Sequence, residues 1–483
     1  MTRGRLVVHG HFYQPLRVDP FSGQVPVDPS ALPFENWNAR VAAECYRPNA
    51  ERRNPGRMSW DLGPTLAEWL ETGDPKAYKG FVDGDRPADR DPAIPLDRGN
   101  GMAQPYHHAI APLGSAADRR TEIRWGLRDF LVRFGRPAEG MWFPETAVDV
   151  ASLRIAAEEG VRYTILAPWQ AATSGLDTRR PYRVELGGGR SIVVMFYDGG
   201  LSSAVSFEPD ATADADRFAR ERIATRLSGP IDATAGPPLV VIATDGELYG
   251  HHQAFRELFL QRLVRPGPGQ PDHGFDVVDL ASAILAPSSR QMPNVRINER
   301  TSWSCHHGVL RWSGECGCVI DGHWKGPLRS AFERLAAAID AVTEAQFGAL
   351  PREPDPWAAR DAYVDVVMGA QPGGSFAAHW IGGQAPVGLR RAFLALMEAQ
   401  RWRLAMFTSD GWYWDDPMRP ETRQVMRMAA RAARLVDAVA GSDLERRLVA
   451  DLGLLRSPRH GLDGAAIYRT ALQEVGQAAA EVA

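Results

Sequence analysis

The stretch PLVVIATDGELYGHH, residues 238–252, contains the pattern that decides the fold. Its first half is almost continuously apolar and rich in Val and Ile, which is typical of a buried parallel strand. Asp245 and Glu247 follow at once, so titratable groups stand where this predicted strand ends. Four other short apolar runs are also predicted as strands: RLVVHG (5–10), EGMWF (139–143), VRYTILAP (161–168) and SIVVMFY (191–197).

Helical patterns separate these predicted strands. They cover residues 117–134, 147–159, 212–226 and 252–263. The first two stop at Gly135 and Gly160, and a glycine just past the last turn is a common helix stop. The alternation of strand and helix predicts an α/β fold with a parallel sheet, and the length of 483 residues favours a barrel.

The pattern changes at about Gly326, where strand signals end. Long helices are predicted from there on, at residues 325–349, 356–369, 384–406, 420–440 and 443–454. We therefore expect a β/α barrel over residues 1–325 and an α-helical C-terminal domain over residues 326–483.

Composition narrows the class of protein. The net charge of −4 gives no basic footprint for nucleic acid. No stretch approaches the length of a membrane span, and the N-terminal apolar run is too short for a secretory signal. Four cysteines do not make a disulfide framework in a chain of 483 residues. We expect a soluble cytoplasmic protein with reduced thiols, and nothing in the composition indicates an oligomeric state.

Polar side chains follow the other predicted strands as well. His9 and His11 end the first strand, and Glu145 follows the second. Asp198 follows the fourth. Because the carboxyl ends of parallel strands meet at one edge of a barrel, we expect these groups to gather with Asp245. Two carboxylates at such an edge suit glycoside hydrolysis, with Glu145 as the nucleophile and Asp245 as the acid and base.

Each of these two acids also has a simpler interpretation. Glu145 lies in EGMWFPETAVD (139–149), where a helix is expected to begin, and helices favour acids at their starts. The aromatic residues just before it would instead keep a nucleophile partly dry and rigid. Asp245 precedes Gly246, so it is equally interpretable as a turn aspartate.

Three motifs, HGHFYQP (9–15), GMWFPE (140–145) and TDGELYGHH (244–252), resemble the ordered motifs of glycoside hydrolase family 57. The resemblance implies an incomplete seven-stranded β/α barrel without a cofactor. It implies a retaining hydrolase or glucan transferase that acts on α-glucans or related α-linked oligosaccharides and polysaccharides. Glu145 then matches the family nucleophile and Asp245 the acid/base. His11 matches the histidine beside the nucleophile in the sugar subsite.

The sequence departs from the family pattern at one position and offers a rival acid at another. Many members have tryptophan where this chain has His252, which bears on substrate preference. MFTSDGWYWDD (406–416) weakly resembles the Ser-Asp-Trp stretch that carries the acid/base of the family's branching enzymes. Asp410 is therefore an alternative acid/base, or a turn aspartate before Gly411. We prefer Asp245 because it ends a predicted strand.

Further side chains are predicted to bind substrate. They are His9, His11, Gln14, His107, Trp142, Asp198, Glu247, His251, Trp303 and Trp312. As an alternative, His9 and His11 would be metal ligands of a carbohydrate deacetylase, which needs at least a third ligand. An inactive sugar-binding relative is the third alternative.

A separate group of sulfur and imidazole side chains lies in the aromatic-rich stretch 301–318. Its members are Cys305, His306, His307, Cys316 and Cys318. Their spacing is not that of a standard zinc finger, so two interpretations stay open. One is a structural zinc site, and the other is a loop with buried thiols.

Overall fold

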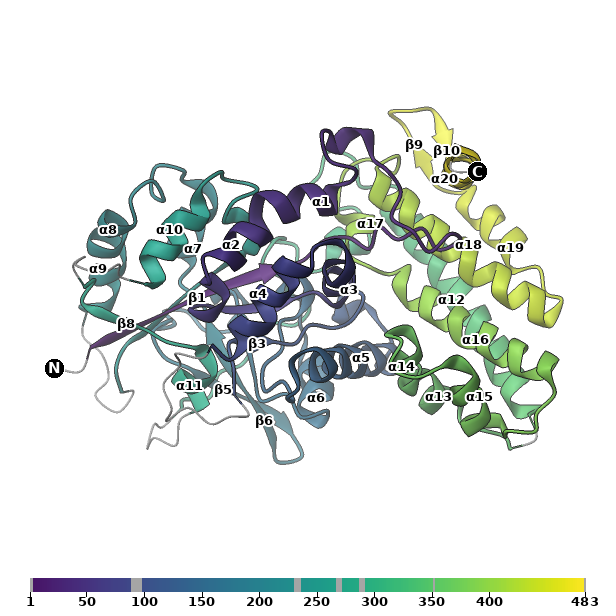
Figure 1. Cartoon of the computed structure of the whole chain (residues 1–483), viewed down its shortest axis with the longest axis horizontal. Coiled ribbons are helices and arrows are strands. Elements are labelled where there is room, and N and C mark those ends of the chain that lie inside the picture. The colour runs from purple at the N-terminus through teal and green to yellow at the C-terminus, as the bar shows by residue number, and fades with distance from the viewer. Residues whose placement is uncertain are drawn as a thin grey trace. The chain divides into compact units, whose positions relative to one another are not determined.

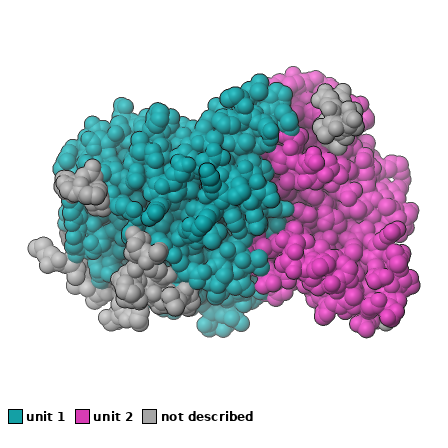
Figure 2. Space-filling model, viewed as in Figure 1, with its two compact units in different colours: residues 1–14, 27–106, 130–303 teal, residues 15–26, 107–129, 304–483 magenta. Residues whose placement is uncertain are grey.

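The computed structural model of the chain describes residues 3–87, 98–229, 236–265, 272–285, 292–350 and 352–481. The chain forms two compact units (Figure 1, Figure 2). Unit 1 comprises residues 1–14, 27–106 and 130–303, and unit 2 comprises residues 15–26, 107–129 and 304–483. The last boundary falls at Ser304, earlier than the expected residue 326, and unit 2 also takes in two segments of the N-terminal half.

Unit 1 is built on a parallel sheet around its first strand, β1 (Gly4–Phe12). β1 pairs in parallel with β2 (Ser59–Leu62), with β7 (Leu239–Asp245) and, near its start, with β8 (Phe275–Val277). β2 pairs in turn with β3 (Gly101–Met102). The register sets His11 opposite Asp61 on β2 and opposite Asp245 on β7.

A second group of strands continues this wall. β4 (Tyr163–Leu166) and β6 (Arg190–Phe196) are parallel, and β5 (Tyr182–Gly187) is antiparallel to β6. Single parallel bridges join Ala103 to Met141 and Gly140 to Tyr163. The Asp198 N–H donates to the carbonyl of Val241 at 2.8 Å, which links the end of β6 to β7. The order β1, β2, β3, 140–141, β4, β6, β7 confirms the expected β/α barrel.

The barrel interior explains the apolar runs of the sequence. Most of β1 is buried, so its run is continuous rather than alternating. The core that these strands enclose contains Val7, Met102, Trp142, Tyr163, Ile165, Met195, Val241 and Ala243. Trp142 is fully buried in this cluster, so its indole packs inside the barrel.

The prediction of a strand at EGMWF (139–143) is wrong in one respect. Only the single bridges at Gly140 and Met141 form there. Pro144 lacks an N–H group, so it cannot extend a strand ladder, and a 3₁₀ turn begins with it at Pro144–Thr146. The other four predicted strands are confirmed as β1, β4, β6 and β7.

Helices of unit 1 cover the strands. They are α1 (Trp37–Val41), α2 (Arg47–Glu51), α3 (Pro64–Gly73), α4 (Pro75–Asp85), α6 (Val150–Glu158), α7 (Gly199–Phe207), α8 (Ala215–Phe218), α9 (Ala224–Leu227), α10 (Arg256–Val264) and α11 (Leu280–Leu285). α6 packs along β6 and α7 along β7, as the crossover helices of parallel strands do. α5 (Ala116–Phe134) contributes residues to both units.

Unit 2 is mainly helical (Figure 1). Its elements are α12 (Lys325–Gly348), α13 (Pro356–Ala362), α14 (Val364–Val367), α15 (Gly373–Ile381), α16 (Val387–Ala405), α17 (Asp410–Tyr413), α18 (Pro420–Ala440), α19 (Leu444–Leu452), β9 (Arg456–Ser457), β10 (Leu462–Asp463) and α20 (Gly464–Glu481). α18 packs against α12, α16, α19 and α20. Its buried alanines at 429, 430, 432 and 433 allow these helices to approach closely. The predicted C-terminal helices are confirmed.

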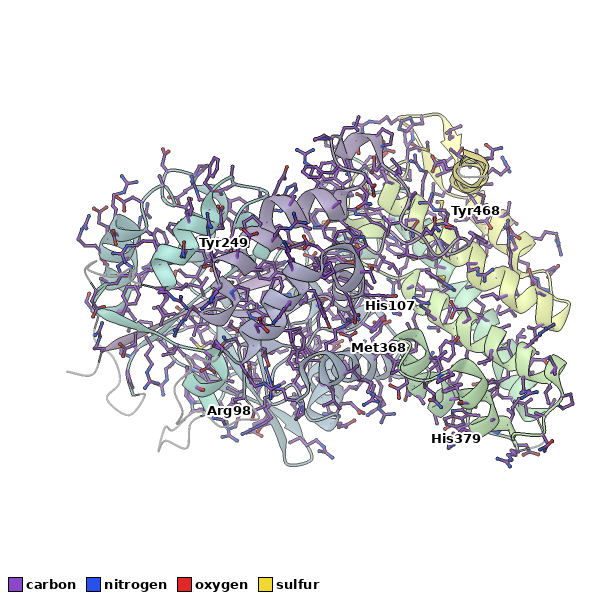
Figure 3. The ribbon with its side chains drawn as sticks, viewed as in Figure 1. Arg98, His107, Tyr249, Met368, His379 and Tyr468 are labelled. Atoms are coloured by element: carbon purple, nitrogen blue, oxygen red, sulfur yellow. The ribbon has the colours of Figure 1, made fainter. Side chains whose placement is uncertain are left out.

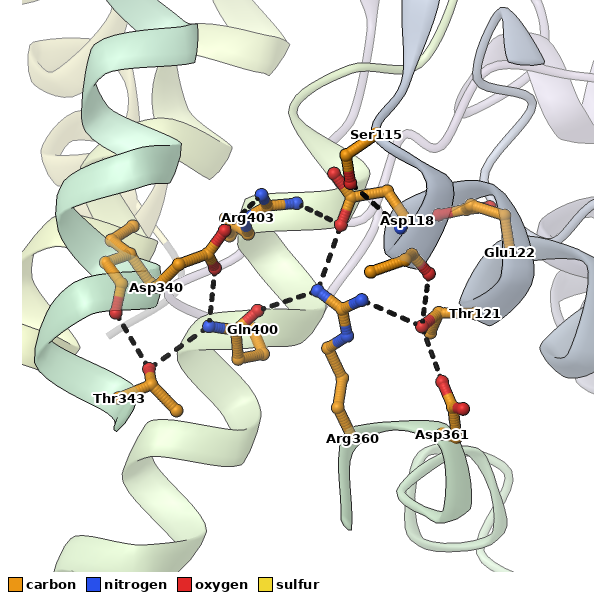
Figure 4. Close-up of polar contacts among 12 residues, drawn as sticks. Ser115, Asp118, Thr121, Glu122, Asp340, Thr343, Arg360, Asp361, Gln400 and Arg403 are labelled. Carbon is orange, nitrogen blue, oxygen red and sulfur yellow. Dashed lines mark hydrogen bonds and ion pairs between the residues drawn. The ribbon is translucent and has the colours of Figure 1, made fainter. Parts of the chain in front are cut away.

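A buried network of charged groups joins the helices of unit 2 (Figure 4). Arg360 donates to Asp118 at 2.9 Å and to Thr121 at 2.9 Å. Arg403 bridges Asp118 and Asp340, each at 2.6 Å. Burial opposes the charged form of Asp118, but Arg403 and Arg360 outweigh it and lower the pKa of that carboxyl. Replacing Arg360, Arg403 or Asp118 would leave the largely buried charges of its partners less well compensated, so the network stabilises the packing of α5, α12, α13 and α16.

Candidate active site

Asp245 ends β7 and is exposed to solvent. Its side chain makes no capping hydrogen bond in the turn that follows. Asp245 therefore does not act as a turn aspartate. The protein around the carboxyl limits its hydration and raises its pKa to about 6. His11 opposes this rise, and Glu145 and Asp61 add to it, so these groups lie within electrostatic reach of one another. An acid that is reachable yet poorly hydrated suits proton transfer near neutral pH.

Gly246 and Glu247 shape the turn after Asp245. A Cβ at Gly246 would lie 2.3 Å from the Phe12 ring. Glycine is therefore needed here because the backbone passes close to this ring, and not because the backbone is left-handed. Glu247 is buried and accepts hydrogen bonds from the Tyr46 hydroxyl at 2.6 Å and the Tyr13 N–H at 3.1 Å. Burial raises the pKa of Glu247 to about 7. The two hydrogen bonds connect the turn after Asp245 to Tyr13 and Tyr46.

Glu145 occupies the centre of the 3₁₀ turn at Pro144–Thr146. Its φ of 57° and ψ of 21° are left-handed, which costs a residue with a side chain roughly 1–2 kcal/mol. The helix that follows, α6, is capped by Asp149, which accepts from the Ser152 N–H at 2.7 Å. The acid at the start of α6 is therefore Asp149 and not Glu145. Glu145 lies in a separate, strained turn before this helix. Such strain is characteristic of functional positions.

Two partners hold the Glu145 turn in place. The indole N–H of Trp303 donates to Glu145 Oε2 at 3.0 Å, and the Trp303 backbone N–H donates to the Glu145 carbonyl at 3.0 Å. Gln170 donates to the Thr146 carbonyl at 2.8 Å and accepts from the Thr146 hydroxyl at 2.8 Å. The carboxylate is therefore oriented by contacts from residues that are distant in sequence.

Replacement of Trp303 by Phe is expected to lower kcat by roughly 10- to 100-fold, because a hydrogen bond to a charged group contributes about 1.5–3 kcal/mol. Phe keeps an aromatic ring against His11 and Trp142 while it removes the donor to Glu145 Oε2. Steady-state kinetics of Trp303→Phe and Trp303→Ala measure this. Little loss in Trp303→Phe beside a large loss in Trp303→Ala would show that packing, and not the hydrogen bond, is what matters.

His9 and His11 converge on Asp61, a buried residue of β2. His9 Nε2 lies 3.0 Å from Asp61 Oδ1, and His11 Nδ1 lies 2.8 Å from Asp61 Oδ2. Gln104 donates to the same Oδ2 at 2.9 Å. Trp142 stacks over both imidazoles, with ring centroids 4.8 Å from His9 and 5.3 Å from His11. His9 and His11 were predicted as possible metal ligands. In the structure, Nε2 of His9 and Nδ1 of His11 are hydrogen-bonded to the Asp61 carboxylate instead.

The two histidines differ in charge. Burial lowers the pKa of His9, so the neutral ring accepts from the Ser59 hydroxyl and donates to Asp61. Burial also disfavours charge on His11, but Asp61, Asp245 and Glu247 outweigh it and raise its pKa to about 9. His11 is thus a fixed cation beside the two acids at the end of β7.

Replacement of Asp61 by Asn is expected to destabilise the fold by about 3–5 kcal/mol, because it breaks a buried charge pair. His11 has a folded pKa of about 9, above the usual 6.5, so its contribution to stability is complete below about pH 6.5 and is lost as the pH rises through 9. Chemical denaturation of both proteins between pH 6 and pH 9.5 tests this. The gap between wild type and Asp61→Asn should narrow at the alkaline end. A gap that does not change with pH would contradict the charged pair.

Aromatic side chains stand beside the acids. Tyr197 follows β6 and makes edge contacts with Trp169 at 6.0 Å and with Trp303 at 6.4 Å between ring centroids. Trp169 is 46% exposed, which leaves ring surface open to a ligand. Flat apolar surfaces with a polar handle suit the faces of sugar rings.

Other predicted binding residues have structural partners in unit 1. Asp198 caps α7 by accepting from the Leu201 N–H at 2.9 Å, and it pairs with Arg226 at 3.2 Å. His251 Nδ1 lies 2.5 Å from Glu44 Oε2. Gln14 hydrogen-bonds Tyr46, the partner of Glu247.

Three predicted residues lie in unit 2. His107, labelled in Figure 3, is buried and bonded through Nδ1 to Glu122 Oε1 at 2.8 Å. Trp312 is fully buried. Asp410 begins α17 and accepts from the Thr408 hydroxyl at 3.1 Å. Unit 2 also contains all five candidate metal ligands. Four of them form a tight group: Cys305, His307, Cys316 and Cys318.

Sequence reasoning missed Asp61, Gln104 and Tyr46. Asp61 lies in a strand of only four residues, where a charged side chain normally argues against burial. Tyr197 and Trp169 stand at predicted strand ends, and that position was the signal available for them.

Scaffold and site together define a β/α-barrel protein with one acid at the end of β7 and another in the turn after the bridges at residues 140 and 141. Residues 99–267 match the family model described as glycosyl hydrolase family 57, and residues 321–483 match one described as a domain of unknown function, DUF3536. The stretch that matches glycosyl hydrolase family 57 includes Glu145 and Asp245, and the stretch that matches DUF3536 follows it.

Solved structures share this fold. The exo-type maltose-forming amylase from Pyrococcus sp. ST04 has a TM-score of 0.73 at 15% identity, over 97% of this chain and 88% of that one. The branching enzyme from Thermococcus kodakaraensis has a TM-score of 0.60 at 15% identity, over 97% and 96%. The 4-α-glucanotransferase from Thermococcus litoralis has a TM-score of 0.55 at 16% identity, over 90% and 60%. No curated protein matches by sequence. Among the described helices, none is long and apolar enough to cross a membrane.

Proposed function

We propose that this protein is a retaining glycoside hydrolase or glucan transferase that acts on α-linked glucans. The observation that carries the proposal is the contrast between its two acids. Glu145 is fixed by Trp303 in a strained turn, and Asp245 has a pKa raised to about 6. Two carboxyl groups in different environments are what a double displacement needs.

In the first step, Glu145 attacks the anomeric carbon and forms a glycosyl-enzyme ester. The bond from that carbon to the leaving oxygen breaks, and the protonated Asp245 transfers its proton to this oxygen. The cation on His11 lies within electrostatic reach of Asp245, so it favours the carboxylate that the transfer produces. The exposed ring of Trp169 would support a sugar ring beside the reacting bond.

In the second step, the ionised Asp245 removes a proton from the incoming hydroxyl group. Attack of that oxygen on the anomeric carbon breaks the ester and releases Glu145 with net retention. Water as the acceptor gives hydrolysis, and a sugar hydroxyl gives transfer.

The pH dependence of kcat/KM follows from the pKa of Asp245. The general acid must carry its proton, so kcat/KM is expected to fall about tenfold per pH unit above pH 6. Rates on a maltooligosaccharide between pH 4 and pH 9 measure this limb. In Asp245→Asn assayed with a glycosyl fluoride, whose departure needs no acid, the limb should disappear. If the alkaline limb of kcat/KM persisted in Asp245→Asn, the titrating group would be a residue other than Asp245.

The test of the proposal is mass spectrometry of products from a maltooligosaccharide of defined length. Shorter products alone mean hydrolysis, and both longer and shorter products mean transfer. Either pattern should vanish in Glu145→Gln. If wild type binds the sugar but forms no product, the protein is a sugar-binding relative without activity, and the proposal fails.

A further inference from the structure

Four side chains of unit 2 converge in the loop before α12. We call Cys305, His307, Cys316 and Cys318 the Cys/His cluster. One ligand atom from each, the three sulfurs and one imidazole nitrogen, lies within 4.8 Å of all the others. Cys305 and Cys316 are buried. His306, the neighbour of His307, does not belong to the group.

Four of the six separations within the Cys/His cluster are close to the edges of a metal-centred tetrahedron, and the other two are at most 4.8 Å. Cys305 Sγ lies 3.3 Å from Cys316 Sγ and 3.7 Å from Cys318 Sγ. His307 Nδ1 lies 3.3 Å from Cys316 Sγ and 3.4 Å from Cys318 Sγ. Bond lengths of about 2.3 Å to sulfur and 2.0–2.1 Å to nitrogen give tetrahedral edges of about 3.6–3.8 Å. Only small shifts separate the observed edges from that geometry.

The number of converging groups argues against a disulfide as the purpose of the site. A disulfide joins two sulfurs, whereas here a third thiol and an imidazole face the same point. We infer that the Cys/His cluster binds one zinc ion in a closed four-ligand site. Three thiolates and an imidazole are a set that structural zinc sites use, and no ligand position is left for substrate.

A buried lysine is an independent observation that fits the same inference. Lys325, the first residue of α12, is fully buried, and its Nζ has no hydrogen-bond partner within the part of the chain that the structure describes. It lies within electrostatic reach of Cys316 and Cys305. Zinc with three thiolates and a neutral imidazole has a net charge of about −1, so the occupied site supplies the negative partner that a buried ammonium requires.

The zinc would tie the two ends of the loop together. Cys305 and His307 stand at its start, and Cys316 and Cys318 at its end, before α12 begins at Lys325. Between them the loop buries Trp312. Trp303, which holds Glu145, precedes Cys305 by two positions, so the metal would anchor the chain directly after that contact.

Metal analysis of the purified full chain tests the inference, with inductively coupled plasma mass spectrometry after expression in zinc-supplemented medium. Wild type and the matched control His306→Ala should each hold about one zinc per chain. His307→Ala and Cys316→Ser should hold at least tenfold less. Equal zinc in His306→Ala and His307→Ala would overturn the ligand assignment, and stoichiometric iron in place of zinc would overturn the identity of the metal.

A second measurement decides the matter if the ligand variants fail to fold. Wild-type protein is stripped with a chelator under reducing conditions and titrated with Co²⁺. The expected result is the intense visible absorption of tetrahedral cobalt, a thiolate-to-metal charge-transfer band, and saturation at about one ion per chain. Weak octahedral absorption alone, or no saturation, would overturn the proposal. Both readouts are independent of enzyme activity, so failure of the proposed function would leave them interpretable.

Discussion

Glu145→Gln is expected to lower the turnover of an α-linked oligosaccharide by roughly 10⁴-fold or more, because no group remains to form the glycosyl-enzyme ester. The Gln carbonyl can still accept the hydrogen bond from Trp303, which is 3.0 Å long in the wild type, so the turn and the fold should persist. Initial rates together with thermal unfolding measure both effects. Glu185→Gln, which changes an exposed acid on β5, is the matched control and should keep full activity.

Rescue by azide makes the assignment of Glu145 specific. Glu145→Gly suits this experiment, because glycine adopts the left-handed backbone of this turn without strain. Azide then attacks the anomeric carbon from the side that the carboxylate has left. An α-linked substrate should give the β-glycosyl azide, with inverted configuration, which the anomeric proton coupling in NMR identifies. Undiminished turnover without azide, or an α-glycosyl azide, would mean that another residue is the nucleophile.

Asp245→Asn is expected to lower kcat/KM on a maltooligosaccharide by about 10²–10⁴-fold, the usual contribution of a general acid. The loss should be much smaller on a glycosyl fluoride, whose leaving group needs no proton. Azide should accelerate the second step and give the α-glycosyl azide, because it intercepts the ester from the open face. The retained product here and the inverted product in the Glu145 variant together identify the two roles.

Asp410, the alternative acid/base, is tested by the same assays as Asp245. Asp410→Asn should retain activity on both substrates, because Asp245 has the raised pKa and the strand-end position. If Asp410→Asn shows the leaving-group dependence and the azide product, and Asp245→Asn does not, the acid/base is Asp410. Asp245 would then act through electrostatics on its neighbours.

The strands that the sequence predicts are mostly buried. β1, β4, β6 and β7 are continuous apolar runs, and such runs leave few alternatives. β2 was missed because its four residues include Ser59 and Asp61, which look like surface residues until their partners are known. EGMWF was only partly a strand because Pro144 ends the extended backbone.

The site follows the same division. Strand-end position predicted that Glu145, Asp245 and His11 gather at one edge of the barrel, and in the structure His11 and Glu145 lie within electrostatic reach of Asp245. Their catalytic roles stay predictions. The network around Asp61 depends on pairing between segments that are about 50 residues apart, and residue types alone do not encode that pairing. The Cys/His cluster was noticed in the sequence, but its unusual spacing favoured buried thiols over zinc. The separations of the ligand atoms favour zinc.

The central position of β1 in the sheet affects how the chain folds during synthesis, because β1 needs partner strands that are translated later. β1 leaves the ribosome well before β7, because the contact between Tyr13 and Glu247 spans 234 positions. At typical translation speeds β1 waits roughly 10–50 s for β7. During that time an apolar strand has an open edge, which can pair with other chains. Fragments that stop before Asp245 are therefore expected to aggregate, and production of the intact protein should benefit from chaperones that shield β1.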